Sequence, residues 1–323
     1  MTLPEHQNRQ TARKARSRAG GLLAGVVADA LLGDPRRGHP VALFGRAATV
    51  IEDRVYADRR ARGAVFAAGC VTLAAGPALA AARLCAARPA AALTLTAAST
   101  WTVVGARSLT TEARRIRMAL LAGDLATARR LLPGLCGRDP ELLDAAGIAR
   151  AVVESLAENC SDAIVAPLLW GALAGPAGLA GYRAVNTLDA MIGHHSARYE
   201  RFGWAAARLD DVANWAPARL TALLAAACAP VVSGDPAAAL ATTRAYARRH
   251  PSPNAGWCEA AFAGALGVRL GGALSYAGRT EQRPELGTGP VPAAADIARA
   301  TRLCRAVATA AAALTAALAL QAG

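Results

Sequence analysis

The stretch Ala64–Ala82, AVFAAGCVTLAAGPALAAA, is 19 residues long and has no charged side chain. A helix that crosses a bilayer needs about 20 apolar residues, within a range of about 17 to 25. Further apolar runs cover residues 89–106, 163–181, 217–232 and 306–320, and Arg219 is the one charged residue within them. We therefore expect an all-α, multi-pass helical membrane protein with a cytoplasmic helical layer. The alternative is a soluble helical protein, because alanine is only weakly hydrophobic and is the best helix former.

The composition agrees with a membrane location. The chain of 323 residues is 54% hydrophobic and 18% charged, with a mean hydropathy of +0.26, whereas about a quarter of the residues of a soluble domain are charged. Lys14 is the only lysine and lies in a polar N-terminal segment, so the body of the chain has no P-loop lysine and no lysine nucleophile. The cysteines form no C-x-x-C pair and the histidines no H-E-x-x-H, so the common zinc and iron–sulfur patterns are absent from the sequence.

The arginines indicate an orientation in the bilayer. They are frequent in the N-terminal tail and across residues 107–150, whereas the connection between the first two long runs has only Arg83 and Arg88. By the positive-inside rule, residues 64–82 and 89–106 form a hairpin whose open end faces the cytoplasm. The net charge of +13 then reflects topology and an anionic substrate rather than nucleic acid, since the arginines are dispersed and lack interleaved aromatic residues.

The positions of Gly and Pro residues along the chain suggest how it is divided into segments. We expect a polar basic tail over residues 1–19 and a single integral membrane domain over residues 20–323. Within this domain, residues 107–160 form a cytoplasmic helical segment, because Gly and Pro separate several short helical patterns there. Residues 21–33 are too short to span a membrane and fit an extended first helix. Residues 278–292 are rich in Gly and Pro, which favours a loop.

Three carboxylates, Glu154, Glu158 and Asp162, are spaced i, i+4 and i+8, which places them along one stripe of a helix. Like charges at this spacing destabilise a helix. Arginines from elsewhere or a metal ion would explain the stripe, and a solvated helix face is the plainer alternative.

Two polar trios follow apolar segments. Their members are each three residues apart: Arg183, Asn186 and Asp189 in one, and Arg208, Asp211 and Asn214 in the other. On a helix each trio occupies one face, with a guanidinium suited to phosphate beside oxygens suited to Mg²⁺. This pattern favours a phosphorylated, Mg²⁺-bound substrate. A lattice of Arg–Asp pairs that joins helices is the structural alternative.

Two loops carry further polar groups. Gly33-Asp34-Pro35 precedes His39-Pro40-Val41, which on its own is ordinary turn chemistry. The prolines of His250-Pro251-Ser252-Pro253-Asn254 hold that segment extended. His250 and Asn254 would then lie at the mouth of a helix, where backbone N–H groups attract anions.

These motifs occur in a fixed order along the chain. They are Gly33-Asp34-Pro35, His39-Pro40-Val41, Glu158-Asn159, Tyr182–Asp189, Ala207–Asp211 and His250–Gly256. Over about residues 22–276 the set resembles the adenosylcobinamide-phosphate synthase family of cobalamin biosynthesis. The resemblance implies a multi-pass membrane enzyme that joins adenosylcobyric acid to aminopropanol or aminopropanol phosphate through an ATP-dependent amide bond. The chain departs from the family pattern at Gly193-His194-His195 and at Cys160-Ser161, and its tail lies outside that pattern.

The resemblance implies roles for the polar residues. ATP would convert the acid into an acyl phosphate, and the amine would then displace phosphate. Asp34, Glu158 and His250 are the candidates for the base that deprotonates the amine, a role worth about 10²–10⁴-fold in rate. The expected Mg²⁺ ligands are Asp189, Asp210 and Asp211, since Mg²⁺ prefers oxygen ligands. The residues expected to bind substrate or phosphate are His39, Asn159, Arg183, Asn186, Arg208, Asn214, Arg219 and Asn254.

The expected cofactors are therefore ATP and Mg²⁺. The expected partners are the corrinoid, the amine, the lipid bilayer and other membrane enzymes of cobalamin assembly, with no nucleic acid. We expect the motif loops on the cytoplasmic side of the cell membrane. Two other readings stay open. A corrinoid transporter would show broken helices that meet at mid-bilayer, and a pathway scaffold without catalysis would tolerate the loss of Arg183 or Arg208.

Overall fold

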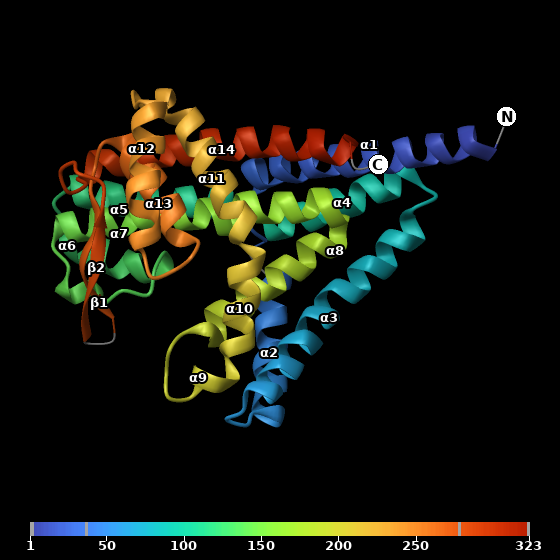
Figure 1. Ribbon diagram of the computed structural model, residues 1–323, viewed down its shortest axis with the longest axis horizontal. Helices are drawn as coiled ribbons and strands as arrows, with labels where there is room; N and C mark the ends of the chain where they lie inside the picture. Colours follow the sequence, from blue (N-terminus) through green and yellow to red (C-terminus); the bar gives the residue numbers. More distant parts are fainter. Residues whose placement is uncertain (1–2, 36–37, 277–278, 322–323) are drawn as a thin grey trace. The chain divides into compact units, whose positions relative to one another are not determined.

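The computed structural model of the protein describes residues 3–35, 38–276 and 279–321. Helices make up nearly all of this part of the chain, together with one two-stranded sheet. The chain divides into two compact units, each assembled from separate stretches of sequence. Figure 1 shows the elements of both units.

The first unit comprises Met1–Gly105, Ala166–Asn214 and Ala311–Gly323. Its first and fourth helices lie so close that a Cβ at Gly21 or Gly25 would collide with Thr96 or Thr100, as is common where small residues let two helices approach. The helices are α1 (Leu3–Leu32), α2 (Pro40–Val55), α3 (Arg60–Cys85), α4 (Pro89–Val103), α8 (Ala166–Leu188), α9 (Tyr199–Phe202) and α10 (Trp204–Ala213), with a π-helical turn (Asp189–Gly193) after α8 and the end of α14.

The second unit comprises Ala106–Val165 and Trp215–Ala310. Its central helix is α13, which is apolar and buried along almost its whole length and packs against α7, α11 and α12. The elements are α5 (Ala106–Leu121), α6 (Leu125–Leu131), α7 (Ala145–Cys160), α11 (Trp215–Cys228), α12 (Pro236–Tyr246), α13 (Ala255–Leu266), β1 (Leu270–Tyr276), β2 (Arg279–Leu286) and most of α14 (Ala294–Gln321). A π-helical turn (Ser161–Val165) follows α7, and 3₁₀ turns occupy Leu132–Gly134, Pro140–Leu142, Ala229–Val232 and Ala247–Arg249.

Among the described residues, four helical stretches are long and apolar enough to cross a membrane: Arg60–Cys85, Ala145–Gly193, Trp215–Val232 and Ala294–Gln321. In α3 only 17% of the apolar window is buried, so most of its apolar side chains face outward as they would toward lipid. The predicted all-α class with membrane-length helices is confirmed. Helix α4 is the exception, because its 15 residues extend about 22 Å and fall short of a hydrocarbon core of about 30 Å.

Two segments differ from the sequence prediction. The basic tail is not separate from the first apolar segment, because α1 runs unbroken through both. Residues 278–292 were expected to form a loop, but β2 occupies part of them and pairs antiparallel with β1. In β1, Gly271 and Gly272 adopt φ values of +82° and +86° at a register irregularity beside Leu270, where a residue with a side chain would be strained.

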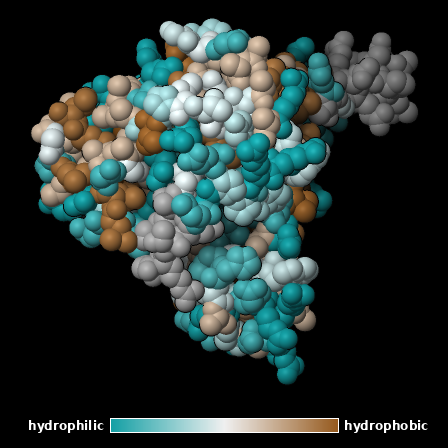
Figure 2. Space-filling model, turned by 60° about the vertical axis from the view of Figure 1, so that its left-hand side comes forward, coloured by the Kyte–Doolittle hydropathy of each residue, from teal (hydrophilic) through white to brown (hydrophobic). Residues whose placement is uncertain are grey.

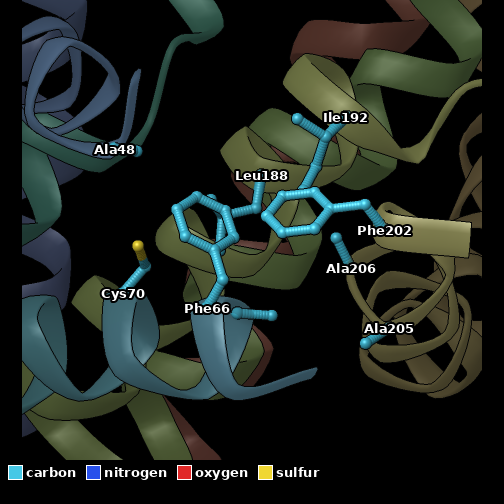
Figure 3. Packing of buried hydrophobic residues seen from close by; sticks show 9 residues of the cluster. Ala48, Phe66, Cys70, Leu188, Ile192, Phe202, Ala205 and Ala206 are labelled. Atoms are coloured by element: carbon cyan, nitrogen blue, oxygen red, sulfur yellow. The ribbon is translucent and has the colours of Figure 1, made fainter. Parts of the chain in front are cut away.

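Phe202 organises the core of the first unit. Its ring lies 5.2 Å from the ring of Phe66, centroid to centroid, and Leu188 and Ile192 complete the cluster (Figure 3). A Cβ at Gly63 would collide with the Phe202 carbonyl, so α3 and α9 require glycine to approach this closely. The cluster fixes the end of α8 against α10, the two helices that carry the polar trios.

Helices α2, α3 and α9 meet at one end of the first unit. The surface of this end is largely hydrophilic and lies at the bottom of the view in Figure 2.

Helix α8 is broken at Gly175, whose φ is +61°, and Pro176 follows it. Proline has no backbone N–H, so the carbonyl of Ala172 four residues earlier loses its helical donor. Arg18 of α1 replaces that donor: its Nη1 lies 3.1 Å from the Ala172 oxygen and 3.2 Å from the Leu173 oxygen. An arginine from the tail thus satisfies the break inside a candidate membrane span.

Candidate functional site

The two polar trios meet in the first unit around Asp210. Asn186 Nδ2 donates to Asp210 Oδ1 at 3.4 Å, and Asn214 Nδ2 donates to Asp210 Oδ2 at 2.9 Å. Arg183 Nη1 in turn lies 3.4 Å from Asn186 Oδ1. Helical spacing places Arg183 and Asn186 on one face of α8 and Asp210 and Asn214 one turn apart at the end of α10. The two faces meet at Asp210. We call Tyr182, Arg183, Asn186, Asp210 and Asn214 the Asp210 network.

Tyr182 is the member of this network to which sequence reasoning gave no role. Its hydroxyl donates to Asn214 Oδ1 at 2.9 Å, and its ring is buried. The sequence did offer a signal for Tyr182. It lies next to Arg183, a predicted binding residue, and one helical turn before Asn186.

The electrostatics of Asp210 are unusual for a carboxylate. Burial raises its pKa, and the charge of Asp211 raises it further, while the amide hydrogen bonds of Asn214 and Asn186 lower it. Neutral amides satisfy the oxygens without cancelling the charge, so a cation placed beside Asp210 would be strongly stabilised.

The other two predicted metal ligands are not part of this arrangement. Asp211 pairs with Arg208 on the same helix, with 3.1 Å between Oδ2 and Nη1. Asp189 opens the π-helical turn, and its carboxylate lies against Gly193. In the part of the chain that the structure describes, no three His, Cys, Asp or Glu side chains converge as metal ligands. A Mg²⁺ held here would take one or two carboxylates and complete its shell with phosphate oxygens and water, as is usual for this ion.

A cavity of about 450 Å³ in the first unit has a mostly apolar lining, to which Asp34, His39, Arg183 and Thr187 add polar side chains. His39 caps α2, because its Nδ1 accepts the Val41 N–H at 3.2 Å. The neutral ring therefore carries its proton on Nε2 and can donate from there. An apolar hollow of about 410 Å³, lined by residues such as Phe44 and Leu73, also includes Arg183.

Arg183 is the charged residue that lines both hollows. Its Nε is buried and, among the described residues, has no hydrogen-bond partner. A buried guanidinium N–H without an acceptor is costly unless an acceptor binds there. An anionic oxygen in the cavity would supply it.

The remaining predicted residues lie in the second unit. Arg219 sits between the rings of Trp215 and Trp257, with its guanidinium carbon 4.7 Å from each centroid. Its Nη1 donates to Asn254 Oδ1 at 2.7 Å and its Nη2 to the Pro253 carbonyl at 3.1 Å. The structure therefore places Arg219 as the anchor of the His250–Asn254 loop.

His250, the first residue of this loop, is buried in a cluster with Glu259 and Arg283. Its Nδ1 accepts the Ser252 N–H at 3.0 Å, and its Nε2 lies 3.7 Å from Glu259 Oε1 and 3.3 Å from Arg283 Nη1. Burial and then the charge of Arg283 lower the pKa of His250 to about 4. Burial raises the pKa of Glu259 well above its usual value, with a further increase from Glu154 and Glu158. The His250 ring is therefore neutral at pH 7, and the raised pKa of Glu259 favours the protonated form of the carboxyl that faces it.

Sequence reasoning missed Glu259 and Arg283. The signal for Glu259 is that it is the one charged residue between Ala255 and Val268, in a helix that is otherwise apolar. Arg283 could not be placed, because its strand was expected to be a loop.

The carboxylate stripe on α7 is explained in part by an arginine from elsewhere. Glu154 forms a buried ion pair with Arg138, and its other oxygen accepts the N–H of Gly271 at 2.6 Å at the base of the hairpin. Asn159 donates to the carbonyl of Ser155 at 3.0 Å. Glu158 and Asp162 lie near Cys258, and their charges contribute to raising its pKa after the larger effect of burial.

A chain whose described part is helical apart from one hairpin, with four helices of membrane length, is a helical membrane protein. The family model described as CobD/Cbib protein matches residues 22–304, so the chain belongs to the CobD/CbiB family. The stretch from 22 onward also agrees with the prediction that the tail lies outside the family pattern.

Three relatives illustrate the similarity, and all have the printed name "Cobalamin biosynthesis protein CobD". The relative from Mycobacterium tuberculosis H37Rv is 53% identical over 289 residues, covering 89% of this chain and 91% of its own. That from Rhodobacter capsulatus is 53% identical over 204 residues, 63% of this chain and 64% of its own. The relative from Chromobacterium violaceum is 43% identical over 283 residues, covering 86% of this chain and 89% of its own. No solved structure matches the chain.

The family match and the names of these relatives show that the chain has a role in cobalamin biosynthesis.

Proposed function

We propose that the protein is an adenosylcobinamide-phosphate synthase, which forms an amide bond between adenosylcobyric acid and aminopropanol or aminopropanol phosphate at the expense of ATP. The observation that carries this proposal is the group of polar side chains that line the cavity of the first unit. It places a carboxylate (Asp34), a ring N–H donor (His39) and an arginine with an unmatched buried N–H (Arg183) around one space of about 450 Å³. An amine and an anionic oxygen are the groups that such a lining recognises.

Arg183 is suited to the anionic part of the reaction. A guanidinium binds phosphate or carboxylate oxygens with a fixed fork of donors, and it remains charged at any working pH. Its position also fits the absence of a lysine in the body of the chain, because an arginine must then neutralise the phosphate charge. When bound, ATP supplies the activation of the acid and leaves phosphate as the group that the amine replaces.

Asp34 is the better placed of the three candidate bases. It lines the cavity with Arg183, where its carboxylate can hold an ammonium group and take a proton from it. His250 is less suited, because Ser252 occupies its Nδ1 lone pair and its pKa of about 4 makes it a weak base. Glu158 lies in the second unit.

Asp210 is the residue that best fits Mg²⁺. Its half-buried carboxylate is held by neutral amides, so a divalent ion would offset the cost of keeping the charge partly out of water. Asp211 would contribute after release from Arg208. Mg²⁺ would there supply positive charge to phosphate oxygens.

One observation favours the transporter reading, namely the break in α8 at Gly175 and Pro176. Broken helices in transporters direct free backbone groups at a substrate. In this protein Arg18 already occupies the freed carbonyls of Ala172 and Leu173, so the break is filled by the chain itself. The enzyme reading is therefore preferred.

The test uses purified, detergent-solubilised protein with adenosylcobyric acid, Mg²⁺-ATP and either aminopropanol or its phosphate. A corrinoid product heavier by the condensed amine, formed only with ATP, is the expected result and identifies the preferred amine. Corrinoid binding without product from either amine would overturn the enzyme reading. The matched control is Arg54→Gln, which removes an exposed arginine of α2 and should leave product formation intact.

A further inference from the structure

Helix α5 has two contrasting faces. Leu109, Ala113 and Ile116 are buried against the rest of the second unit. On the outer side, Met118 and Leu121 are 52% and 55% exposed, close in sequence to the exposed Arg114 and Arg115. A basic amphipathic helix with large apolar side chains on its exposed side is typical of a membrane interface.

An open hollow of about 570 Å³ lies between α5 and α6. Arg114, Arg115 and Thr111 provide donors along it, and Met118 and Leu131 provide apolar surface. Polar and apolar groups thus line the same space, as a molecule with a charged head and an apolar tail requires.

The balance of charge in this hollow is positive. Arg115 has an exposed partner, Glu112, with 3.0 Å between Nη1 and Oε1, and such a pair is weak. Arg114 pairs with no carboxylate in the described part of the chain. The single acid that lines the hollow, Asp124, is committed to capping α6, where its Oδ1 accepts the Thr127 N–H at 2.9 Å.

The position of α5 in the chain points to lipid as the occupant. The helix packs on α7, which begins the membrane-length stretch Ala145–Gly193, and its arginines are the ones that the positive-inside rule assigns to the cytoplasmic side. The lipid surface on that side is negative. We propose that the hollow between α5 and α6 binds the headgroup of an anionic phospholipid, with Met118 and Leu121 against its acyl chains.

The experiment counts lipids bound to the full-length protein by native mass spectrometry in a nonionic detergent. Phosphatidylglycerol is titrated against phosphatidylcholine, with glycerol phosphate and inorganic phosphate as soluble anions. The wild type should retain phosphatidylglycerol selectively. Arg114→Gln/Arg115→Gln should weaken that binding by about fivefold for each arginine removed. Met118→Ser/Leu121→Ser should weaken lipid binding while leaving the arginines in place.

The matched control is Arg244→Gln/Arg248→Gln, which removes two exposed arginines of the same unit and should leave the lipid count unchanged. All four side chains of the two test variants are exposed, so both variants should elute as the wild type does in size exclusion. The proposal is overturned if the Arg114/Arg115 variant binds lipid no more weakly than the control, or if soluble phosphate competes as well as the lipid. A change from dimer to monomer mass in that variant, with lipid binding intact, would assign the face to a second copy of the chain instead.

Discussion

The Tyr182 hydroxyl donates to Oδ1 of Asn214 at 2.9 Å, and this bond fixes which end of the Asn214 amide faces Asp210. With Oδ1 taken by the phenol, Nδ2 is directed at the Asp210 carboxylate, 2.9 Å away. Tyr182 therefore orients the amide that donates to the Asp210 carboxylate.

Replacing Tyr182 with Phe should release the Asn214 amide and slow product formation by about fivefold, since a hydrogen bond between neutral groups contributes about 0.5–1.5 kcal/mol. The ring stays in place, so the unfolding temperature should fall only slightly. Product mass and thermal unfolding are measured on the same preparation. Tyr246→Phe is the control, and equal rates for the two variants would contradict the role of the Tyr182 hydroxyl.

Asp210→Ala should reduce ATP-dependent product formation by about 100-fold or more, because the variant removes the carboxylate of the Asp210 network. Asp211→Ala should have a smaller effect, since its side chain is paired on the surface with Arg208. Rates are measured across a Mg²⁺ titration, with Asp53→Asn on the exposed side of α2 as the control. Full activity in both aspartate variants, correctly inserted in membranes, would exclude them from the site.

Arg183→Lys should lose most of the activity even though it keeps the charge, because lysine cannot offer the planar fork that two acceptors require. We expect a loss of about 30-fold for Lys and more for Gln, measured as kcat/KM for each substrate in turn. The substrate whose KM rises most is the one whose anionic group lies in the cavity. Unchanged KM values for all three substrates would remove Arg183 from substrate binding.

His250 and Glu259 should give opposite dependences of stability on pH. The pKa of His250 is lowered from 6.5 to about 4, so it stabilises the fold above pH 6.5 and this contribution, about 3 kcal/mol, is lost as the pH falls toward 4. The pKa of Glu259 is raised, so its contribution is present below its ordinary pKa and is lost as the pH rises.

Two substitutions separate these contributions. Glu259→Gln should make the protein lose stability on acidification from pH 7 to pH 5, and His250→Gln should shift the trend the other way. Thermal unfolding in detergent across that range provides the measurement. Parallel curves for the two variants would show that the pair does not titrate as described.

The Asp210 network was within reach of the sequence because its members follow helical spacing. Arg183 and Asn186 are neighbours on one helix face, and Asn214 and Asp210 are one turn apart on the other side. Which face of α8 meets which face of α10 depends on the packing around Phe202, and that contact joins residues far apart in the chain.

Other features depend on non-local contacts that periodicity does not carry. The partner of Glu154 is Arg138, which lies on an irregular segment. His250 contacts Arg283, which lies on a strand that the Gly and Pro residues of this region led us to expect as a loop. Arg219 was expected to bind substrate, and only the packing of two tryptophans around it shows that its donors serve a loop.

The contact of Arg18 with the broken helix α8 has a practical consequence for anyone who trims this chain. The family match begins at residue 22, so a truncation designed from sequence similarity alone would discard Arg18. The Ala172 and Leu173 carbonyls would then lack their donor inside a membrane-length helix, where an unsatisfied backbone group costs several kcal/mol. We therefore expect a chain that starts at residue 22 to be less stable than one that retains Arg18.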